Sequence, residues 1–460
     1  MSVIDSIWHD DMMERKPSSD FLTSYLLSND HVHVLNVNSP WGAGKSFFLK
    51  RWAQTLSQKH VCISFNAWES DYSSEPLVAL VTCIEQQTSN SLPSAVDAAG
   101  KTLVEASSTL IRKAAPLIMK GLIRKISGVE LDELLGEGSE GVTSSIVESL
   151  VEEQAATEKN VLEFKSEVVK RLQVAAKENN KVAPAFIFID ELDRCRPTYA
   201  IELLERVKHF FELDECRFII ASDSEQLAHS IRAVYGQGFA SEKYLNRFFD
   251  VEFRLDNTNK FAVVAQNLPV IDSLAIGINV SGDVQRSALL SAERDPVQAR
   301  TSTVVCNVPG FTENAIIIVG LSKYFKVELR EIVNYIKQIN SASASLSGKV
   351  HFFWLAFLVF CKSIHPVQYS ILFSNSKQEE ALKHLDENGE IITFSFTSSL
   401  VSITDLVSFY LRVLSANRDE LSRMSNGLSP WQGELFYDIK DERNSLRLYK
   451  GLVELAHRIS

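Results

Sequence analysis

Two glycines, a lysine and a serine stand at spacings that suit phosphate binding in the segment SPWGAGKS, which ends at Ser46. Gly42 and Gly44 let the backbone curl so that its N–H groups can face phosphate oxygens. Lys45 can neutralise the β- and γ-phosphates of a nucleotide, and Ser46 can ligate Mg²⁺. The strict pattern GxxxxGK[ST] has a glycine where this chain has Ser39, but the chemistry survives that change. The segment therefore predicts a phosphate-binding loop, or Walker A motif.

The predicted phosphate contacts cover the whole loop and the start of the helix expected after it at 46–58. The positive end of that helix dipole adds to the attraction for an anion. A glycine-containing turn with a chance lysine is the alternative, and the apolar run expected as a strand at 32–38 argues against it. The nucleotide-binding residues expected here are Ser39, Pro40, Trp41, Gly42, Ala43, Gly44, Lys45, Ser46 and Phe47.

Two adjacent acids end a second apolar run, FIFIDE. Asp190 would stand at the carboxyl end of a buried strand, where it can hold Mg²⁺. Glu191 beside it can accept a proton from an attacking water. A solvated turn is the alternative for such a pair taken alone. Together with the phosphate loop, the pair indicates a Walker B motif in which Ser46 and Asp190 bind the metal and Glu191 is the catalytic base.

The elements that must position these residues alternate along the chain. Short β-branched or aromatic runs are separated by segments with helical spacing, such as 197–212. This alternation predicts an α/β fold, with a parallel sheet covered by helices on both faces. The expected strands are 32–38, 61–67, 185–190, 217–222 and 248–255.

Length and composition narrow the class of protein. The chain has 460 residues, a net charge of −11 and 45% apolar residues, which is typical of a globular protein with two to four domains. Six sparse cysteines without metal-binding spacing favour a cytoplasmic protein. The acidic start does not resemble a signal peptide, and the longest apolar run, FFWLAFLVFC, is too short to cross a bilayer. We therefore expect no transmembrane span.

We expect four parts along the chain. Residues 1–90 and 180–255 would form the nucleotide-binding core, and 91–179 a helical insertion between the two motifs. Residues 256–340 would form a lid-like region and 341–460 a helical C-terminal domain. The insertion divides into a basic arm, 107–126, and an acidic arm, 130–178.

The charge of the two arms suggests that the insertion is specific to this chain. Residues 130–163 hold ten acids and one lysine, so most of the net charge belongs to this stretch. The basic arm holds five cations and an apolar stripe at helical spacing. Such a helix could lie on an anionic membrane surface, enter a partner's groove or bind nucleic acid, although nucleic acid is not specifically indicated. A helix docked on its own domain is the equally weighted alternative.

The sequence resembles the KAP family of P-loop NTPases. The matching pieces are PWGAGKS, FNAWESD, FIFIDELDRCRP, FIIASDSEQLAHSI and YLNRFFDVEFRL, in this order. The resemblance implies an AAA+-like ATPase core with an added catalytic glutamate, and ATP as the nucleotide. It also implies a bacterial anti-phage role and partner proteins encoded nearby. Many family members carry membrane helices in the insertion, whereas the insertion of this chain is charged.

The resemblance implies three further site residues. Asp223 would correspond to the polar residue at a strand end that contacts the γ-phosphate, or else would only cap the next helix. Arg247 would reach the nucleotide of a neighbouring subunit, or else pair with Glu242 or Asp250 on its own surface. Arg330 would correspond to the lid arginine that contacts nucleotide, or else face solvent.

Two hypotheses for the function follow. The first is Mg²⁺-dependent ATP hydrolysis that drives or gates a conformational change in a homo-oligomer or multiprotein assembly, in anti-phage defence. The second is an ATP-binding switch or scaffold with little turnover that organises a partner or membrane-surface complex. A P-loop kinase or nucleic-acid motor is a third interpretation, and Glu191 argues against the kinase.

Overall fold

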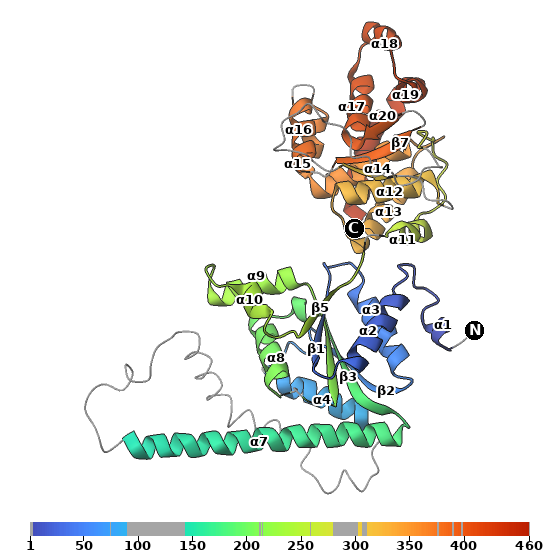
Figure 1. Ribbon diagram of the computed structural model, residues 1–460. Coiled ribbons are helices and arrows are strands. Elements are labelled where there is room, and N and C mark those ends of the chain that lie inside the picture. The colour runs from blue at the N-terminus through green and yellow to red at the C-terminus, as the bar shows by residue number, and fades with distance from the viewer. Residues whose placement is uncertain are drawn as a thin grey trace, which may run out of the picture. The chain divides into compact units, whose positions relative to one another are not determined.

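The computed structural model describes residues 3–73, 75–89, 143–210, 213, 215–257, 259–278, 302–305, 311–374, 377–388, 391–396 and 399–459. The chain forms two compact units, Met1–Asp256 and Asn257–Ser460 (Figure 1). The basic arm, 107–126, and the first part of the acidic arm, 130–142, lie outside the described residues.

The first unit is built on a parallel five-stranded sheet in the order β2-β3-β4-β1-β5. The two motif-bearing strands β1 and β3 are therefore separated by β4, and their carboxyl ends meet at the same edge of the sheet. The α/β fold predicted from the alternation of elements is confirmed. The strands are β1 (Val34–Asn38), β2 (His60–Asn66), β3 (Val182–Asp190), β4 (Cys216–Ser222) and β5 (Val251–Arg254).

Helices cover both faces of this sheet, because successive strand residues point to opposite sides. Phe186 and Phe188 of β3 pack with α2 and α3 on one face. Ile187 and Ile189 pack with α4, α7, α8 and α9 on the other. The helices are α1 (Val3–Ile7), α2 (Lys16–Ser28), α3 (Lys45–Leu56), α4 (Pro76–Ser89), α7 (Thr143–Glu178), α8 (Pro197–Phe210), α9 (Ser224–Tyr235) and α10 (Ser241–Leu245).

The described part of the insertion is one helix, α7, of 36 residues. Its carboxyl-terminal half packs on the core through a buried stripe at helical spacing, which includes Phe164, Val168 and Leu172. Its amino-terminal half continues past α4 (Figure 1). The helical character predicted for the acidic arm is therefore observed from Thr143 onward.

The second unit is mainly helical around one hydrophobic core. At its centre lies α14, in which every residue of Phe352–Cys361 is buried. This apolar run is a core helix, as its short length predicted. The helices are α11 (Phe261–Asn267), α12 (Glu313–Tyr324), α13 (Leu329–Ser343), α14 (Phe352–Ile364), α15 (Pro366–Leu372), α16 (Gln378–Asn388), α17 (Ile403–Ser415), α18 (Arg418–Met424), α19 (Pro430–Asp441) and α20 (Arg443–Ala456).

The structure differs from the expected organisation of this region in two respects. The boundary expected at residue 340 does not separate two cores, because Ile332 and Ile336 of α13 share one core with Phe357 of α14 and Val453 of α20. A small sheet was also missed, with strand order β6-β7-β8. Its strands are β6 (Ser302–Val305), β7 (Ile391–Phe396) and β8 (Ser399–Ser402).

Among the helices of the described ranges, none combines the length and the apolar content that crossing a bilayer requires.

Candidate functional site

The loop between β1 and α3 carries the Walker A residues. Its backbone passes through the left-handed region at Gly42, with φ of 84°, and at Gly44, with φ of 88°. Gly44 is the N-cap of α3, and no side chain caps this helix. The first-turn amides of α3, including those of Lys45 and Ser46, therefore have no intrahelical acceptor. They form a group of donors that a phosphate can use.

The Lys45 side chain folds back into this loop and is only 9% exposed. Its ammonium nitrogen donates to the carbonyl oxygens of Ser39 at 2.6 Å and of Pro40 at 3.3 Å. The same nitrogen lies 3.3 Å from a carboxylate oxygen of Asp193. An ammonium group has three N–H donors, and here three acceptors surround it.

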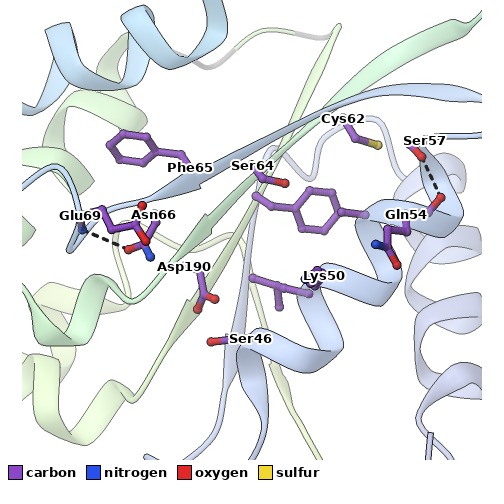
Figure 2. A pocket seen from close by; sticks show the side chains of 13 residues that line it. Ser46, Lys50, Gln54, Ser57, Cys62, Ser64, Phe65, Asn66, Glu69 and Asp190 are labelled. Carbon is purple, nitrogen blue, oxygen red and sulfur yellow. Dashed lines mark hydrogen bonds between the residues drawn. The ribbon is translucent and has the colours of Figure 1, made fainter. Parts of the chain in front are cut away.

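The two predicted metal ligands, Ser46 and Asp190, lie next to each other in the structure. Ser46 lies in the first turn of α3, Asp190 ends β3, and their side chains face each other (Figure 2). Burial raises the pKa of Asp190, while hydrogen bonds from the Ser46 hydroxyl and the Glu191 backbone N–H counteract that rise. A desolvated carboxylate beside a hydroxyl is a pair of hard oxygen donors, so these residues fit Mg²⁺.

A groove of about 550 Å³ starts at this pair and runs between α3 and the edge strand β2. Gln54 of α3, the C-cap residue Ser57, and Cys62 and Ser64 of β2 line its far part (Figure 2). Burial raises the pKa of the Cys62 thiol to about 12, so this cysteine is an uncharged wall residue. The groove gives the Ser46–Asp190 pair an open side.

Glu191 has an unusual backbone conformation. It lies in the left-handed region, with φ of 59°, where residues other than glycine, asparagine and aspartate are uncommon. One carboxylate oxygen accepts from Arg194 at 2.7 Å, and the other accepts from the Asn66 amide at 3.2 Å. An ionised carboxylate offers about four acceptor sites, so Glu191 can also accept from a water. The left-handed backbone of Glu191 is strained, and backbone strain is concentrated at functional sites.

Asp193 connects three parts of the site that are distant in sequence. It lies in the short turn Leu192–Arg194 that follows Glu191, and its side chain is only 1% exposed. Besides the Lys45 ammonium group, it accepts from the Trp41 indole at 2.9 Å and from the Asp223 backbone N–H at 2.8 Å. Sequence reasoning missed this residue, and the only available signal was a third acid in FIDELD.

Arg15, the N-cap residue of α2, supports the phosphate loop. It is 3% exposed and donates to the carbonyl oxygens of Ala43 at 2.7 Å and of Gly44 at 3.2 Å. It also donates to the carbonyl oxygen of Asp256 at 3.2 Å, at the last residue of the first unit. No motif marks this arginine, so the sequence carried no signal for it.

Arg194 and Arg196 fasten the turn after β3. Arg194 pairs with Glu191 and stacks over the Trp68 ring, with 5.7 Å from the guanidinium carbon to the ring centroid. Arg196 forms a 2.9 Å ion pair with Asp71 in the loop after β2. Together they tie the FNAWESD segment to the Walker B turn.

Of the other predicted site residues, Asp223 borders the site through the hydrogen bond from its backbone N–H to Asp193. Asp223 is the N-cap of α9 and accepts from the Gln226 backbone N–H at 3.2 Å, as the capping alternative expects. Phe47 lies under the Arg51 guanidinium, 4.9 Å from its carbon. Arg330 is exposed in the first turn of α13, in the second unit. Nucleotide contacts of Asp223 and Arg330 stay predictions.

Arg247 is exposed on the turn between α10 and β5. The two local ion pairs considered for it are not found in the part of the chain that the structure describes. Glu242 pairs with Arg232 instead, and Asp250 pairs with Lys208 at 2.9 Å. A role of Arg247 in a neighbouring subunit stays a prediction.

Comparison with known proteins agrees with this geometry. The model of the KAP family P-loop domain matches residues 15–345, which extends from Arg15 through both motifs into the second unit. No curated protein sequence matches the chain significantly. The family match covers more than half of the chain, and it includes the phosphate loop, the acidic pair and the sheet that brings them together. The chain therefore belongs to the KAP family of P-loop NTPases.

Proposed function

We propose that this protein is a Mg²⁺-dependent ATPase. The observation that carries the proposal is the contact between Ser46 and Asp190 beside the uncapped amides of α3. That arrangement offers two oxygen ligands for a metal and a row of donors for phosphates within one site. Membership of a nucleotide-binding family supports the same conclusion.

Each residue would have a distinct role. The first-turn amides of α3 and Lys45 would hold the β- and γ-phosphates, and Ser46 and Asp190 would hold Mg²⁺. When bound, Mg²⁺ supplies positive charge to the phosphate oxygens. Glu191 would orient a water and accept its proton as that water attacks the γ-phosphorus. Arg247 of a neighbouring subunit would stabilise the charge that develops in the transition state.

We further propose that hydrolysis changes the arrangement of the P-loop core and the helical region. This conformational change would be transmitted to a partner protein or to a second copy of the chain. The proposal rests on the visible motifs, since they supply one catalytic centre for nucleotide and none for a second substrate. The basic arm is our candidate for contact with a partner or a membrane surface. A cytoplasmic location fits the cysteine usage of the sequence.

Phosphate release tests the ATPase proposal. The wild type should hydrolyse ATP with Mg²⁺ and stop when EDTA is added, while Lys45→Ala should lose nucleotide binding. Asp190→Asn removes one metal ligand, so it should raise the Mg²⁺ concentration needed for half-maximal turnover. ATP hydrolysis that persists in EDTA, or in Lys45→Ala, would contradict the proposal.

The anti-phage role rests on the family resemblance alone and needs its own test. Cells that carry the wild type should survive phage challenge better than cells that carry Lys45→Ala or Glu191→Gln at equal protein levels. Full protection by both variants would contradict an ATP-dependent defence role.

An ATP-binding switch with little turnover is the second candidate. It is favoured by the engagement of Glu191 with both Asn66 and Arg194, because each carboxylate oxygen already accepts one hydrogen bond and an attacking water would have to share one of them. Tight ATP binding with no phosphate release, alone and with partners, would support the switch against the ATPase.

A further inference from the structure

We propose that Asp193 is a positioning residue that holds Lys45 in a resting arrangement, and that a nucleotide must displace this contact in order to bind. The inference rests on the proposed function, since it assumes that nucleotide phosphates bind at the loop between β1 and α3. It assigns a role to a buried acid that is not among the predicted site residues.

The first step is the saturation of the Lys45 ammonium group. Its three N–H donors face the carbonyl oxygens of Ser39 and Pro40 and the carboxylate of Asp193. A phosphate oxygen can gain a hydrogen bond from Lys45 only if one of these acceptors is given up. Asp193 is the anionic acceptor of the three, so an incoming phosphate replaces one negative charge with another.

The second step is that Asp193 does not become unsatisfied when Lys45 leaves. Its carboxylate keeps the Trp41 indole and the Asp223 backbone N–H as donors. Those two donors belong to the phosphate loop and to the junction between β4 and α9. Asp193 therefore stays in place as Lys45 moves, and it keeps the two segments next to each other.

The third step is how strongly Asp193 competes with a phosphate oxygen for the Lys45 ammonium group. The side chains of Lys45 and Asp193 are 9% and 1% exposed, so solvent screens their attraction only weakly. Asp193→Asn keeps the shape and an acceptor oxygen but removes the charge. We expect this change to tighten Mg·ADP binding about tenfold, which corresponds to about one charge-assisted hydrogen bond.

Calorimetric titration of the full-length protein with Mg·ADP tests this expectation. The matched control is Asp250→Asn, which removes a carboxylate charge from an ion pair with Lys208 just before β5, at the opposite edge of the sheet. Asp193→Asn should lower the Kd about tenfold, and Asp250→Asn should leave it near the wild-type value. A Kd for Asp193→Asn that equals or exceeds that of the wild type would overturn the inference, since a purely structural role predicts that result.

A second measurement covers the case in which Asp193→Asn does not fold. In a crystal structure of the wild type with Mg·ADP, the Lys45 nitrogen should lie beyond about 4 Å from Asp193, outside ion-pair distance. An ion pair that persists with ADP bound would refute the inference while leaving the ATPase proposal intact. A wild type that binds no nucleotide would refute the proposed function, and the inference with it.

Discussion

Substitution of Gly44 by alanine perturbs the phosphate loop at the point where two constraints meet. Gly44 has φ of 88°, and an added Cβ would lie 2.8 Å from the Arg15 Nη1 atom. That nitrogen donates to the Gly44 carbonyl oxygen at 3.2 Å, and its neighbour in the guanidinium donates to the Ala43 carbonyl oxygen. The methyl group therefore strains the backbone and displaces the side chain that supports the loop.

The two costs can be estimated separately. A left-handed conformation costs a residue with a side chain about 1–2 kcal/mol. Loss of one hydrogen bond from a charged donor costs roughly 1.5–3 kcal/mol. Gly44→Ala should therefore lower the free energy of unfolding of the first unit by about 3 kcal/mol and should weaken Mg·ADP binding, because the loop amides lose their arrangement.

Urea unfolding and ADP titration measure these effects, and the chain offers a matched control. Gly427 has φ of 87°, and an added Cβ would have no atom within 4 Å. Gly427→Ala should therefore show only the backbone cost, about 1–2 kcal/mol in the second unit, with ADP affinity unchanged. Equal losses of stability in the two variants, or full ADP affinity in Gly44→Ala, would refute the role given to Arg15.

Three further predictions concern pH, loop support and subunit contacts. Burial lowers the pKa of His351 to about 4 from its ordinary 6.5. As the pH falls from 6.5 towards 4, the unfolded state therefore binds the proton first, and the second unit loses stability. Urea unfolding at pH 5 should give a free energy of unfolding about 2 kcal/mol lower than at neutral pH. A His351→Phe variant whose free energy of unfolding depends on pH in the same way would contradict this prediction. Arg15→Met keeps the bulk but removes the donors, so ADP affinity and the melting temperature of the first unit should both fall; an unchanged affinity would exclude support of the loop by Arg15. If Arg247 acts across a subunit boundary, mixing Arg247→Ala with Lys45→Ala should yield ATP turnover that neither variant shows alone, and a mixture without turnover would speak against it.

The sequence was sufficient for the elements whose signals are local. Apolar runs ending in Asn38 and Asp190 predicted β1 and β3, because buried parallel strands are short and apolar and the motif residues follow them directly. Parallel strands place their carboxyl ends at one edge, so the meeting of Ser46 with Asp190 could be expected from the fold class.

Other parts of the site depend on contacts between distant segments. Arg15 and Gly44 are 29 residues apart, and Asp193 meets Trp41 only because β3 and β1 lie in one sheet with β4 between them. No local pattern records such contacts. The expected boundary at residue 340 was misleading for the same reason, since a loop in sequence does not show that α13 and α14 share a core.

The most direct test of the central claim is ATP turnover by Glu191→Gln, measured together with ATP affinity. If Glu191 is the base that accepts the proton of the attacking water, the substitution should lower kcat on the order of 10²–10⁴-fold and leave the Kd for ATP near the wild-type value. Glu202→Gln, which neutralises a carboxylate paired with Arg206 on α8, is the matched control and should keep wild-type turnover. Wild-type kcat in Glu191→Gln would contradict the account.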